Sequence, residues 1–304
     1  MKAGIRARCV ACRMGVFRVI VKTYADVESF LSNTQAQLES NEVANSLMLG
    51  VCLRLARSPQ AVKTAPYLGT VGDEKGLVLA AMMTPPHKLV VYGHQGDLDG
   101  AARLLAEDLV GGGWKVPGVR GPTEVARSVA QSWARSTGQR CELERQQRVH
   151  MLRKAGRPLP ERGRLRLATP ADIELATEWR YAFDIAVFGQ ADREAARQAA
   201  EHRIGEGDLY LWEDERPVSM ATMTRPTRNG ISVSLVYTPP QWRGRGYATA
   251  CVGELSRLLL ASGWGYCALF AEVANAAANR VYQKIGYQPV CEYEEYAFLE
   301  EPYP

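Results

Sequence analysis

Two arginines alternate with two glycines in one short segment, residues 243–246, which reads Arg-Gly-Arg-Gly. The segment lies between a strand predicted over residues 231–237 and a helix predicted over residues 247–260. Glycine lets the backbone adopt left-handed dihedrals and approach a ligand closely. The first turn of a helix presents unpaired N–H groups and a partial positive charge, to which arginine adds full charge. The segment therefore predicts a site for a phosphate or pyrophosphate group.

The spacing of these residues narrows the kind of phosphate ligand. The dinucleotide fingerprint requires a third glycine where Thr249 stands, and no Gly-Lys-Ser/Thr sequence follows the strand. What remains is a Gln-x-x-Gly-x-Gly pattern made by Gln241, Gly244 and Gly246. An ordinary tight turn or an RNA-binding box in a disordered tail would contain similar residues, but the flanking strand and amphipathic helix argue against the tail.

A second group of polar residues opens the next predicted helix, which covers residues 275–285 and follows a strand predicted over 266–271. This helix carries Asn275, Asn279 and Tyr282, and Gly286 after it indicates a helix C-cap. Together with the loop after Gln241, these residues resemble both signature regions of the GNAT superfamily of acetyl-CoA-dependent N-acetyltransferases. The resemblance spans about residues 164–300.

The resemblance implies which residues bind acetyl-CoA, the expected cosubstrate, and it implies no metal. Backbone groups at the splayed end of the strand would hold the acetyl carbonyl and the pantetheine arm, and the loop would hold the pyrophosphate. The cofactor-binding residues expected on this basis are Val236, Tyr237, Thr238, Gln241, Arg243, Gly244, Arg245, Gly246, Tyr247, Ala248, Asn275 and Asn279.

The resemblance also implies direct transfer, in which a neutral amine attacks the thioester carbon while both substrates share one site. Backbone N–H groups near residues 236–238 would stabilise the oxyanion. Tyr282 would protonate the leaving thiolate as general acid, and a packed aromatic with a satisfied hydroxyl is the other interpretation. Glu272 is the candidate base, and an exposed charge at the end of a strand is the alternative.

The elements that must position these residues follow a mixed α/β order with a β-meander in the middle. Predicted helices cover residues 170–187, 193–204, 247–260 and 275–285. Predicted strands cover residues 165–167, 209–212, 218–224, 231–237, 266–271 and 290–298.

The first half of the chain repeats the end of this order about 150 residues earlier. Gly113-Trp114 follows a helix predicted over 98–110 in the same way as Gly263-Trp264 follows the later helix. The repeat indicates duplication of a whole domain, and chance similarity of two generic α/β halves is the alternative. The other repeated elements are strands at 77–83, 89–92 and 141–151 and a helix at 123–134.

The first copy departs from the pattern where the chemistry would be. Its loop lacks arginine and places Asp97 and Asp99 at the start of the helix. Carboxylates there cap the helix themselves and repel a pyrophosphate. At the same offset from the tryptophan as Tyr282 stands Ser132, which cannot replace a phenol as acid. We expect this copy to have lost cofactor binding and to pack on the catalytic half or shape the acceptor cleft.

The length of 304 residues predicts two domains. We expect an α/β (α+β) fold in which each domain is GNAT-like, with a mixed, mostly antiparallel central sheet flanked by helices. The boundaries expected are a leader at 1–15, a degenerate domain at 16–155, a linker at 156–163 and the catalytic domain at 164–304. Seven dispersed cysteines predict reduced thiols. Cys9 and Cys12 form a C-x-x-C in the leader, with a redox or metal role as the alternative.

The net charge of the chain and its hydropathy pattern limit the kinds of partner that the protein is expected to have. A net charge of +4 argues against nucleic acid, although the Arg-rich segment 141–170 leaves it as an alternative. No window reaches the roughly 18 apolar residues of a membrane span, and no signal-peptide core follows the basic start, so a cytoplasmic protein is expected. The acceptor is expected to be a small-molecule or peptide amine, and neither its identity nor the oligomeric state follows from the residues. A non-catalytic acyl-CoA sensor or scaffold is the alternative to an enzyme.

Overall fold

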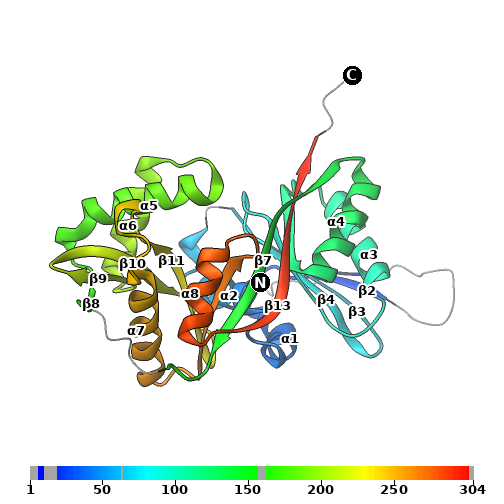
Figure 1. Cartoon of the computed structure of the whole chain (residues 1–304). Coiled ribbons are helices and arrows are strands. Elements are labelled where there is room, and N and C mark those ends of the chain that lie inside the picture. Colours follow the sequence, from blue (N-terminus) through cyan, green and yellow to red (C-terminus); the bar gives the residue numbers. More distant parts are fainter. Residues whose placement is uncertain (1–5, 10–18, 63, 157–161, 301–304) are drawn as a thin grey trace. The chain divides into compact units, whose positions relative to one another are not determined.

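The computed structural model of the chain divides into two compact units (Figure 1). The residues that it describes are 6–9, 19–62, 64–156 and 162–300. Unit 1 comprises Met1–Val149, Glu272–Ala274 and Val290–Pro304, and unit 2 comprises His150–Ala271 and Asn275–Pro289.

Unit 1 is a mixed sheet covered by helices. Its strands follow the order β1-β2-β3-β4-β5-β6-β13-β7, in which β5 and β6 are parallel and the pairs from β1 to β5 are antiparallel. The elements are β1 (Arg6–Cys9), β2 (Ile20–Thr23), α1 (Val27–Ser40), α2 (Ser46–Arg57), the 3-10 turn η1 (Pro59–Ala61), β3 (Tyr67–Asp73), β4 (Gly76–Met83), β5 (Leu89–Gly93), α3 (Leu98–Gly111), β6 (Gly118–Pro122), α4 (Thr123–Thr137), β7 (Arg140–Leu152) and β13 (Gln288–Leu299).

Unit 2 is built in the same way, with the strand order β12-β11-β10-β9-β8. β11 and β12 are parallel, and the other pairs are antiparallel. The elements are β8 (Arg164–Leu167), η2 (Pro170–Asp172), α5 (Ile173–Phe188), α6 (Arg193–Gly205), β9 (Leu209–Asp214), β10 (Arg216–Thr224), β11 (Gly230–Tyr237), η3 (Pro240–Trp242), α7 (Tyr247–Ala261), β12 (Tyr266–Glu272) and α8 (Ala276–Ile285).

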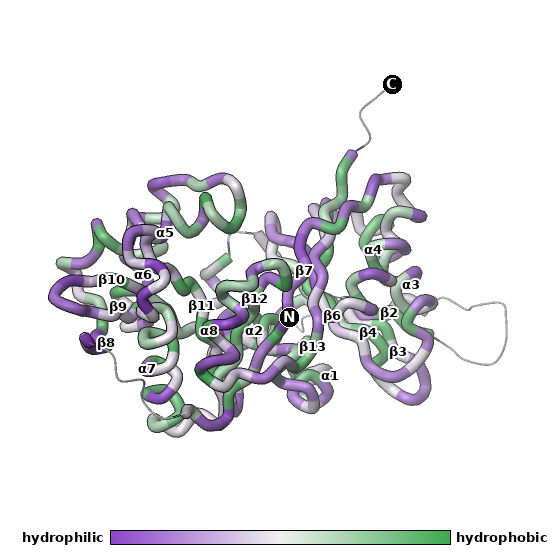
Figure 2. The backbone as a smooth tube through the Cα atoms, viewed as in Figure 1, coloured by the Kyte–Doolittle hydropathy of each residue, from purple (hydrophilic) through white to green (hydrophobic). Residues whose placement is uncertain are grey.

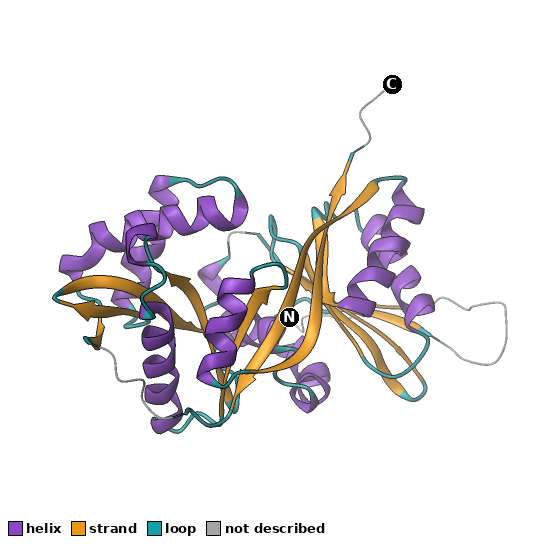
Figure 3. Cartoon of the chain, viewed as in Figure 1, coloured by secondary structure: helices purple, strands orange, loops and turns teal. Residues whose placement is uncertain are grey.

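Each sheet buries an apolar layer on both faces. In unit 2, α7 and α8 lie side by side and share one core with alternate residues of β11 and β12, while α5 and α6 share another core with β9 and the end of β11 (Figure 3). In unit 1, α3 and α4 contribute to one core and α1 and α2 to the other. This arrangement confirms the predicted class of helix-flanked, mostly antiparallel sheets.

The two halves of the chain repeat one order of elements, β-α-α-β-β-β-α-β-α-β, from β2 to β7 and again from β8 to β13. The repeat extends to single hydrogen bonds. The N–H of Trp114 donates to the carbonyl of Leu109 (3.0 Å), and the N–H of Trp264 donates to that of Leu259 (3.3 Å). The glycine before each tryptophan has a positive φ. These shared turns support duplication over chance similarity.

The grouping of residues differs from the expected boundaries at both ends of the chain. β13 pairs antiparallel with β6, and residues 290–304 group with unit 1, whereas the expected catalytic domain runs to residue 304. Within the expected leader, Arg6–Cys9 forms β1 and pairs with β2. The described residues do not include the rest of the leader, to which Cys12 belongs. They also do not include residues 157–161 of the expected linker.

The first part of the Arg-rich segment 141–170, which left a nucleic-acid role open, lies in β7. Figure 2 shows β7 and β13 as largely hydrophilic. Several of their charges are paired, because Arg148 contacts Glu292 at 2.5 Å and Lys88 of unit 1 contacts both Glu144 and Glu295. This part of the segment therefore fits a solvated strand with compensated charge. None of the described helices is long and apolar enough to cross a membrane.

Candidate functional site

β11 and β12 separate at the centre of unit 2. Their parallel pairing joins Gly230–Ser232 to Tyr266–Ala268, and both strands continue well beyond it, β11 to Tyr237. The later residues of β11 therefore leave the ladder on the side of β12. This separation fits the splayed strand end that the family resemblance implied around residues 236–238.

A β-bulge sits in β11 just before that strand end. Tyr237 pairs with Met220 and Ser234 pairs with Thr222, so β11 contains one residue more than β10 between the same two rungs. Leu235 lies there with a φ of 50°, a conformation that an L-residue rarely adopts. A bulge takes backbone groups out of the ladder and re-aims them. Sequence reasoning missed it, because nothing in the type of a leucine signals a positive φ.

The loop after β11 leaves the start of α7 open. Gly244 and the N-cap Gly246 have φ values of 76° and 87°, as glycine allows at little cost. No side chain of the described residues caps α7 at Gly246. The first N–H groups of the helix and its positive dipole end are therefore available to an anion, as the sequence predicted.

Both arginines of the loop are held by neutral groups. Arg243 donates from Nε to the carbonyl oxygen of Thr238 (2.9 Å), and its guanidinium lies 5.9 Å from the centre of the Tyr237 ring. Arg245 stacks over Trp242 at 5.0 Å. Within the described part of the chain, neither guanidinium has a carboxylate partner, and both side chains are exposed. Their charge therefore remains available to a ligand.

Aromatic side chains pack together in the loop between β11 and α7 and hold it in place. Trp242 lies edge-on to Tyr247, with ring centres 6.4 Å apart. The Tyr247 hydroxyl donates to Asp214 on β9 (2.7 Å), and this bond raises the pKa of Tyr247. Ser219 on β10 is hydrogen-bonded to Thr238 through their hydroxyls (2.9 Å). The loop and the strand end are thus joined to β9 and β10, a support that the sequence did not reveal.

The corresponding helix start in unit 1 is closed. Asp97 is the N-cap of α3 and accepts from the N–H of Gly100 (2.9 Å). Asp99 accepts from the hydroxyl of Ser128 (2.6 Å). The start of α3 therefore carries two carboxylates, whereas the loop before α7 carries two guanidinium groups. The loss of cofactor binding by this copy stays a prediction that the geometry favours.

Tyr282 lies in α8 within the core that α7 and α8 share. Its ring centre is 6.1 Å from that of Tyr287 and 6.3 Å from that of His150, and the residue is 7% exposed. Burial raises the pKa of Tyr282 to about 12, so the phenol stays protonated at neutral pH. A general acid must hold its proton until the thiolate leaves. Its role as general acid stays a prediction, and a packed aromatic side chain remains the alternative interpretation.

The two asparagines organise the start of α8. Asn275 is the N-cap and accepts from the N–H of Ala278 (3.0 Å). Asn279 donates from Nδ2 to the carbonyl of Asn275 (3.0 Å). Gly286 ends the helix with a φ of 109°, which confirms the predicted C-cap. Contact of either asparagine with a cofactor stays a prediction.

Glu272 ends β12 and is not an isolated charge. Its carboxylate accepts from Arg145 of β7 (2.7 Å to Nε) and from the amide of Gln147 (3.0 Å). Its side chain is 32% exposed. These two contacts fix the orientation of the carboxylate. The guanidinium, however, occupies electron pairs that a base would use to accept a proton. Its role as base stays a prediction.

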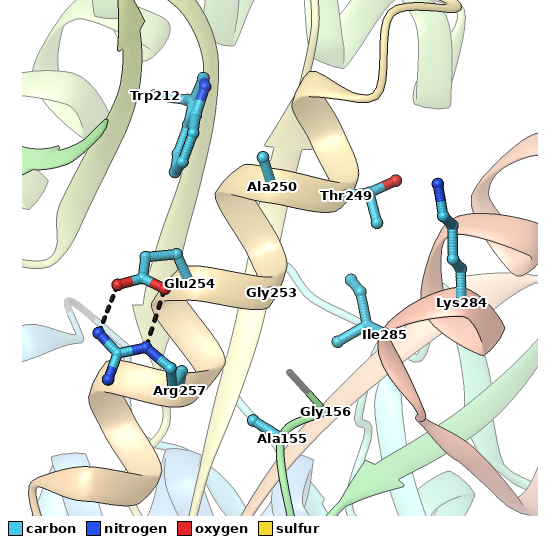
Figure 4. Close-up of a pocket in the computed structure, with 10 residues that line it drawn as sticks. All are labelled: Ala155, Gly156, Trp212, Thr249, Ala250, Gly253, Glu254, Arg257, Lys284 and Ile285. Carbon is cyan, nitrogen blue, oxygen red and sulfur yellow. Dashed lines mark hydrogen bonds and ion pairs between the residues drawn. The ribbon is translucent and has the colours of Figure 1, made fainter. Parts of the chain in front are cut away.

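A small cavity of about 140 Å³ lies beside α7 (Figure 4). None of the predicted cofactor-binding residues lines it, and ligand pockets usually enclose about 300–1,000 Å³. It is therefore distinct from the loop site. Its lining includes Trp212, Thr249, Gly253, Arg257, Lys284 and Ile285.

Comparisons with known proteins agree with this geometry. Residues 173–287 match the model of the acetyltransferase (GNAT) family. A search of curated proteins found no match. Among solved structures, the chain resembles a GNAT-family acetyltransferase from Colwellia psychrerythraea, with 14% identity, a TM-score of 0.57, and coverage of 92% of this chain and 99% of that one.

Two further solved structures extend the similarity. A Drosophila protein has 14% identity and a TM-score of 0.62, with coverage of 92% of this chain and 98% of that one. A GCN5-related N-acetyltransferase from Sphaerobacter thermophilus has 17% identity and a TM-score of 0.56, with coverage of 81% and 84%. At such identities these likenesses show the fold, which reaches into both halves of the chain.

The match to the GNAT family model and the mixed α/β fold support an acyltransferase. Residues 173–287 form an acetyltransferase domain of the GNAT family. The similarity of solved structures over 92% of the chain, together with the repeated element order, supports a second GNAT-like domain in the N-terminal half.

Proposed function

We propose that this protein transfers the acetyl group of acetyl-CoA directly to an amine. The observation that carries the proposal is the start of α7, where Gly246 leaves the helix without a side-chain cap beside the exposed guanidinium groups of Arg243 and Arg245. An open helix N-terminus with unpaired cations favours a diphosphate, which coenzyme A carries. These residues fit that cosubstrate, and the carboxylates at the same place in unit 1 do not.

Acetyl-CoA supplies an acyl group activated as a thioester. The strand end at residues 236–238 is tied to the diphosphate loop through the Arg243–Thr238 bond, so one ligand can engage both. N–H groups that the bulge at Leu235 removes from the ladder would donate to the thioester oxygen as it gains charge. The fork would hold amine and thioester together, which lowers the entropic cost of their encounter.

Proton transfers complete the proposed reaction. The amine nitrogen forms a bond to the acetyl carbon, the carbon–sulfur bond breaks, and the sulfur leaves as thiolate. Tyr282, protonated because burial raises its pKa to about 12, would give its proton to that sulfur. A base accepts the proton that the amine nitrogen loses, and Glu272 is the candidate from the sequence.

The acceptor is proposed to be a small-molecule or peptide amine. The free thiols of the described residues, Cys52, Cys141, Cys251, Cys267 and Cys291, fit a reducing compartment, for which we propose the cytoplasm. A non-catalytic sensor remains the second candidate, because Tyr282 is packed as a core aromatic. It would bind acetyl-CoA without acetylating any amine.

Calorimetric titration of coenzyme A tests the site. Gly244→Glu adds a carboxylate at the loop, and Gly138→Glu is its matched control, because both glycines have nearly equal φ values (76° and 75°) and open space around the added side chain. We expect the first variant to lose binding and the second to keep it. Release of free thiol with a panel of amines then tests turnover. Absence of binding to the wild type, or equal binding by Gly244→Glu, would overturn the proposal.

A further inference from the structure

The cavity beside α7 lies within unit 2 and shares no residue with the proposed diphosphate loop. Its walls come from α7, the end of α8, β9 and the two residues Ala155 and Gly156 that follow β7 (Figure 4). Its volume is about 140 Å³. An apolar cavity of about 150 Å³ in another protein binds benzene. The cavity is therefore large enough for one six-membered ring.

A glycine in the middle of α7 keeps the cavity open. Glycine at such a position destabilises a helix relative to alanine, and the φ of Gly253 is not in the left-handed region that would require it. Outside the backbone of α7, a Cβ added to Gly253 would meet only two side-chain carbons of Ile285, at 3.8 and 4.0 Å. These are ordinary van der Waals distances, so close packing does not require glycine either. The effect of the missing side chain is to leave room in the cavity.

Trp212 of β9 gives the cavity an aromatic wall. The residue is 6% exposed, and its indole Nε1 donates to the carbonyl oxygen of Arg162 (3.2 Å). Because the N–H is already bonded, the indole offers the cavity its ring. Ala250 and Ile285, both buried, add aliphatic surface. Walls of this kind favour a flat hydrocarbon ring.

One cation at the cavity lacks a balancing charge. Lys284 of α8 is exposed and has no carboxylate partner among the residues that the structure describes. The other cation, Arg257, donates from Nε to Oε2 of Glu254 (2.9 Å) and forms an ion pair with that residue. Figure 4 shows the hydroxyl of Thr249 directed toward the ammonium group of Lys284. An ammonium and a hydroxyl together can donate to a group that carries one negative charge.

The apolar and the charged parts of the cavity lie on different sides of it. In Figure 4, the indole of Trp212 and the ammonium group of Lys284 stand on opposite sides. One molecule satisfies both when its ring lies against the indole and its anionic group lies beside the ammonium. A free phosphate offers no apolar surface to the indole, and an amine would be repelled by Lys284. A ring that carries a carboxylate has both of the required parts.

We propose that this cavity is a second ligand site and that it binds a small aromatic carboxylate. In this site Trp212 and Ile285 contact the ring, Lys284 and Thr249 bind the carboxylate, and Gly253 provides the space. The proposal goes beyond the acetyl transfer and does not depend on it, because it uses none of the residues assigned to that reaction.

Calorimetric titration of the full-length protein with benzoate tests the site. Benzamide carries the same ring without the charge, and acetate carries the charge without the ring. The variants are Gly253→Ala and Lys284→Gln. Their matched controls are Gly205→Ala, at the end of α6, where an added Cβ would meet nothing within 4 Å, and Lys115→Gln, which changes an exposed lysine of unit 1.

We expect the wild type to bind one benzoate per chain, at least about fivefold more tightly than benzamide or acetate. Gly253→Ala should weaken benzoate binding by about tenfold, because the added methyl group overfills the cavity. Its thermal midpoint should rise, since alanine favours the helix, so the weaker binding would not reflect unfolding. Lys284→Gln should abolish the preference for benzoate over benzamide. Both control variants should bind benzoate as the wild type does.

Two further measurements separate this cavity from the diphosphate loop. Benzoate should bind equally in the presence and absence of saturating coenzyme A, and equally to Gly244→Glu. Competition with coenzyme A, or loss of benzoate binding in Gly244→Glu, would overturn the inference by placing benzoate at the loop. Absence of benzoate binding to the wild type, or unchanged binding by Gly253→Ala, would also overturn it. Benzoate binding by a protein that does not bind coenzyme A would support the inference and refute the proposed acetyl transfer.

Discussion

Arg243 and Thr238 connect the two halves of the candidate site, because the guanidinium Nε of Arg243 donates to the carbonyl oxygen of Thr238 at 2.9 Å. The bond ties the loop proposed to hold the diphosphate to the strand end proposed to hold the acetyl group. It uses only one of the five N–H groups of the guanidinium. The same arginine can therefore position the strand end and contact an anion.

The first prediction concerns this arginine. Arg243→Gln should weaken coenzyme A binding by about tenfold and make it less sensitive to salt, because a cation near the diphosphate is lost. Titration calorimetry at two ionic strengths measures both effects. Arg257→Gln is the control, since Arg257 pairs with Glu254 on α7, away from the loop. An unchanged salt dependence in Arg243→Gln would remove the arginine from the diphosphate site.

The second prediction concerns Tyr282. Tyr282→Phe should lower kcat by about 10²–10⁴-fold and leave the affinity for coenzyme A unchanged, because a general acid acts in the transition state. Tyr287→Phe is the control, and it removes the hydroxyl bonded to Ser256 (2.8 Å) at a cost of about 1 kcal/mol in stability without affecting the chemical step. Steady-state thiol release measures kcat and urea unfolding measures stability, so together they separate the effect on catalysis from the effect on stability. Equal kcat in wild type and Tyr282→Phe would favour the packed-aromatic interpretation.

The pH dependence follows from the same residue. The required form of Tyr282 is the protonated one, and burial raises its pKa to about 12. The acid is therefore fully present below that pH and is lost only as pH rises through it. The rate should show no decline attributable to Tyr282 between about pH 7 and pH 10. A decline near pH 10 that disappears in Tyr282→Phe would contradict the raised pKa.

The local parts of the site were predictable from the sequence, and its non-local parts were not. Glycine at 244 and 246 has a conformational meaning that the residue type itself carries, and the helix after it has an apolar period of its own. The bulge at Leu235 depends on how β10 and β11 pair, and no leucine announces it.

The partner of the last strand also depends on long-range pairing. A strand near residues 290–298 was evident, but local alternation does not say which sheet it joins. α1 and α2 were not predicted, and α2 illustrates why. Its sequence SLMLGVCL is apolar on nearly all sides, so periodicity alone does not separate a buried helix from a buried strand.

Anchoring of α5 gives a prediction about stability at low pH. Asp172 accepts from Arg166 (2.8 Å) and from the N–H of Thr169 (2.8 Å), and its bond with Arg166 lowers its pKa from 3.8 to about 2. A lowered pKa means that the stabilisation is present above about pH 4 and is lost as pH falls through about 2. Asp172→Asn should cost about 2 kcal/mol at pH 7, measured by urea unfolding. The difference from wild type should shrink toward pH 2, and a constant difference would refute the linkage.

The pairing of β13 within unit 1 gives the last prediction. Phe298 stacks on Trp133 of α4 with ring centres 5.5 Å apart and is 8% exposed, so it belongs to the core of unit 1. Phe298→Ala should destabilise that unit by about 3–5 kcal/mol, because a large buried ring is replaced by a cavity. Coenzyme A binding by unit 2 should persist, because its loop and forked strands remain. Hydrogen exchange measured peptide by peptide should therefore show faster exchange in β4, β5 and α4, with α7 and β11 unchanged. Faster exchange confined to α7 and β11 would instead mean that the last strand supports the catalytic half, as the sequence alone had indicated.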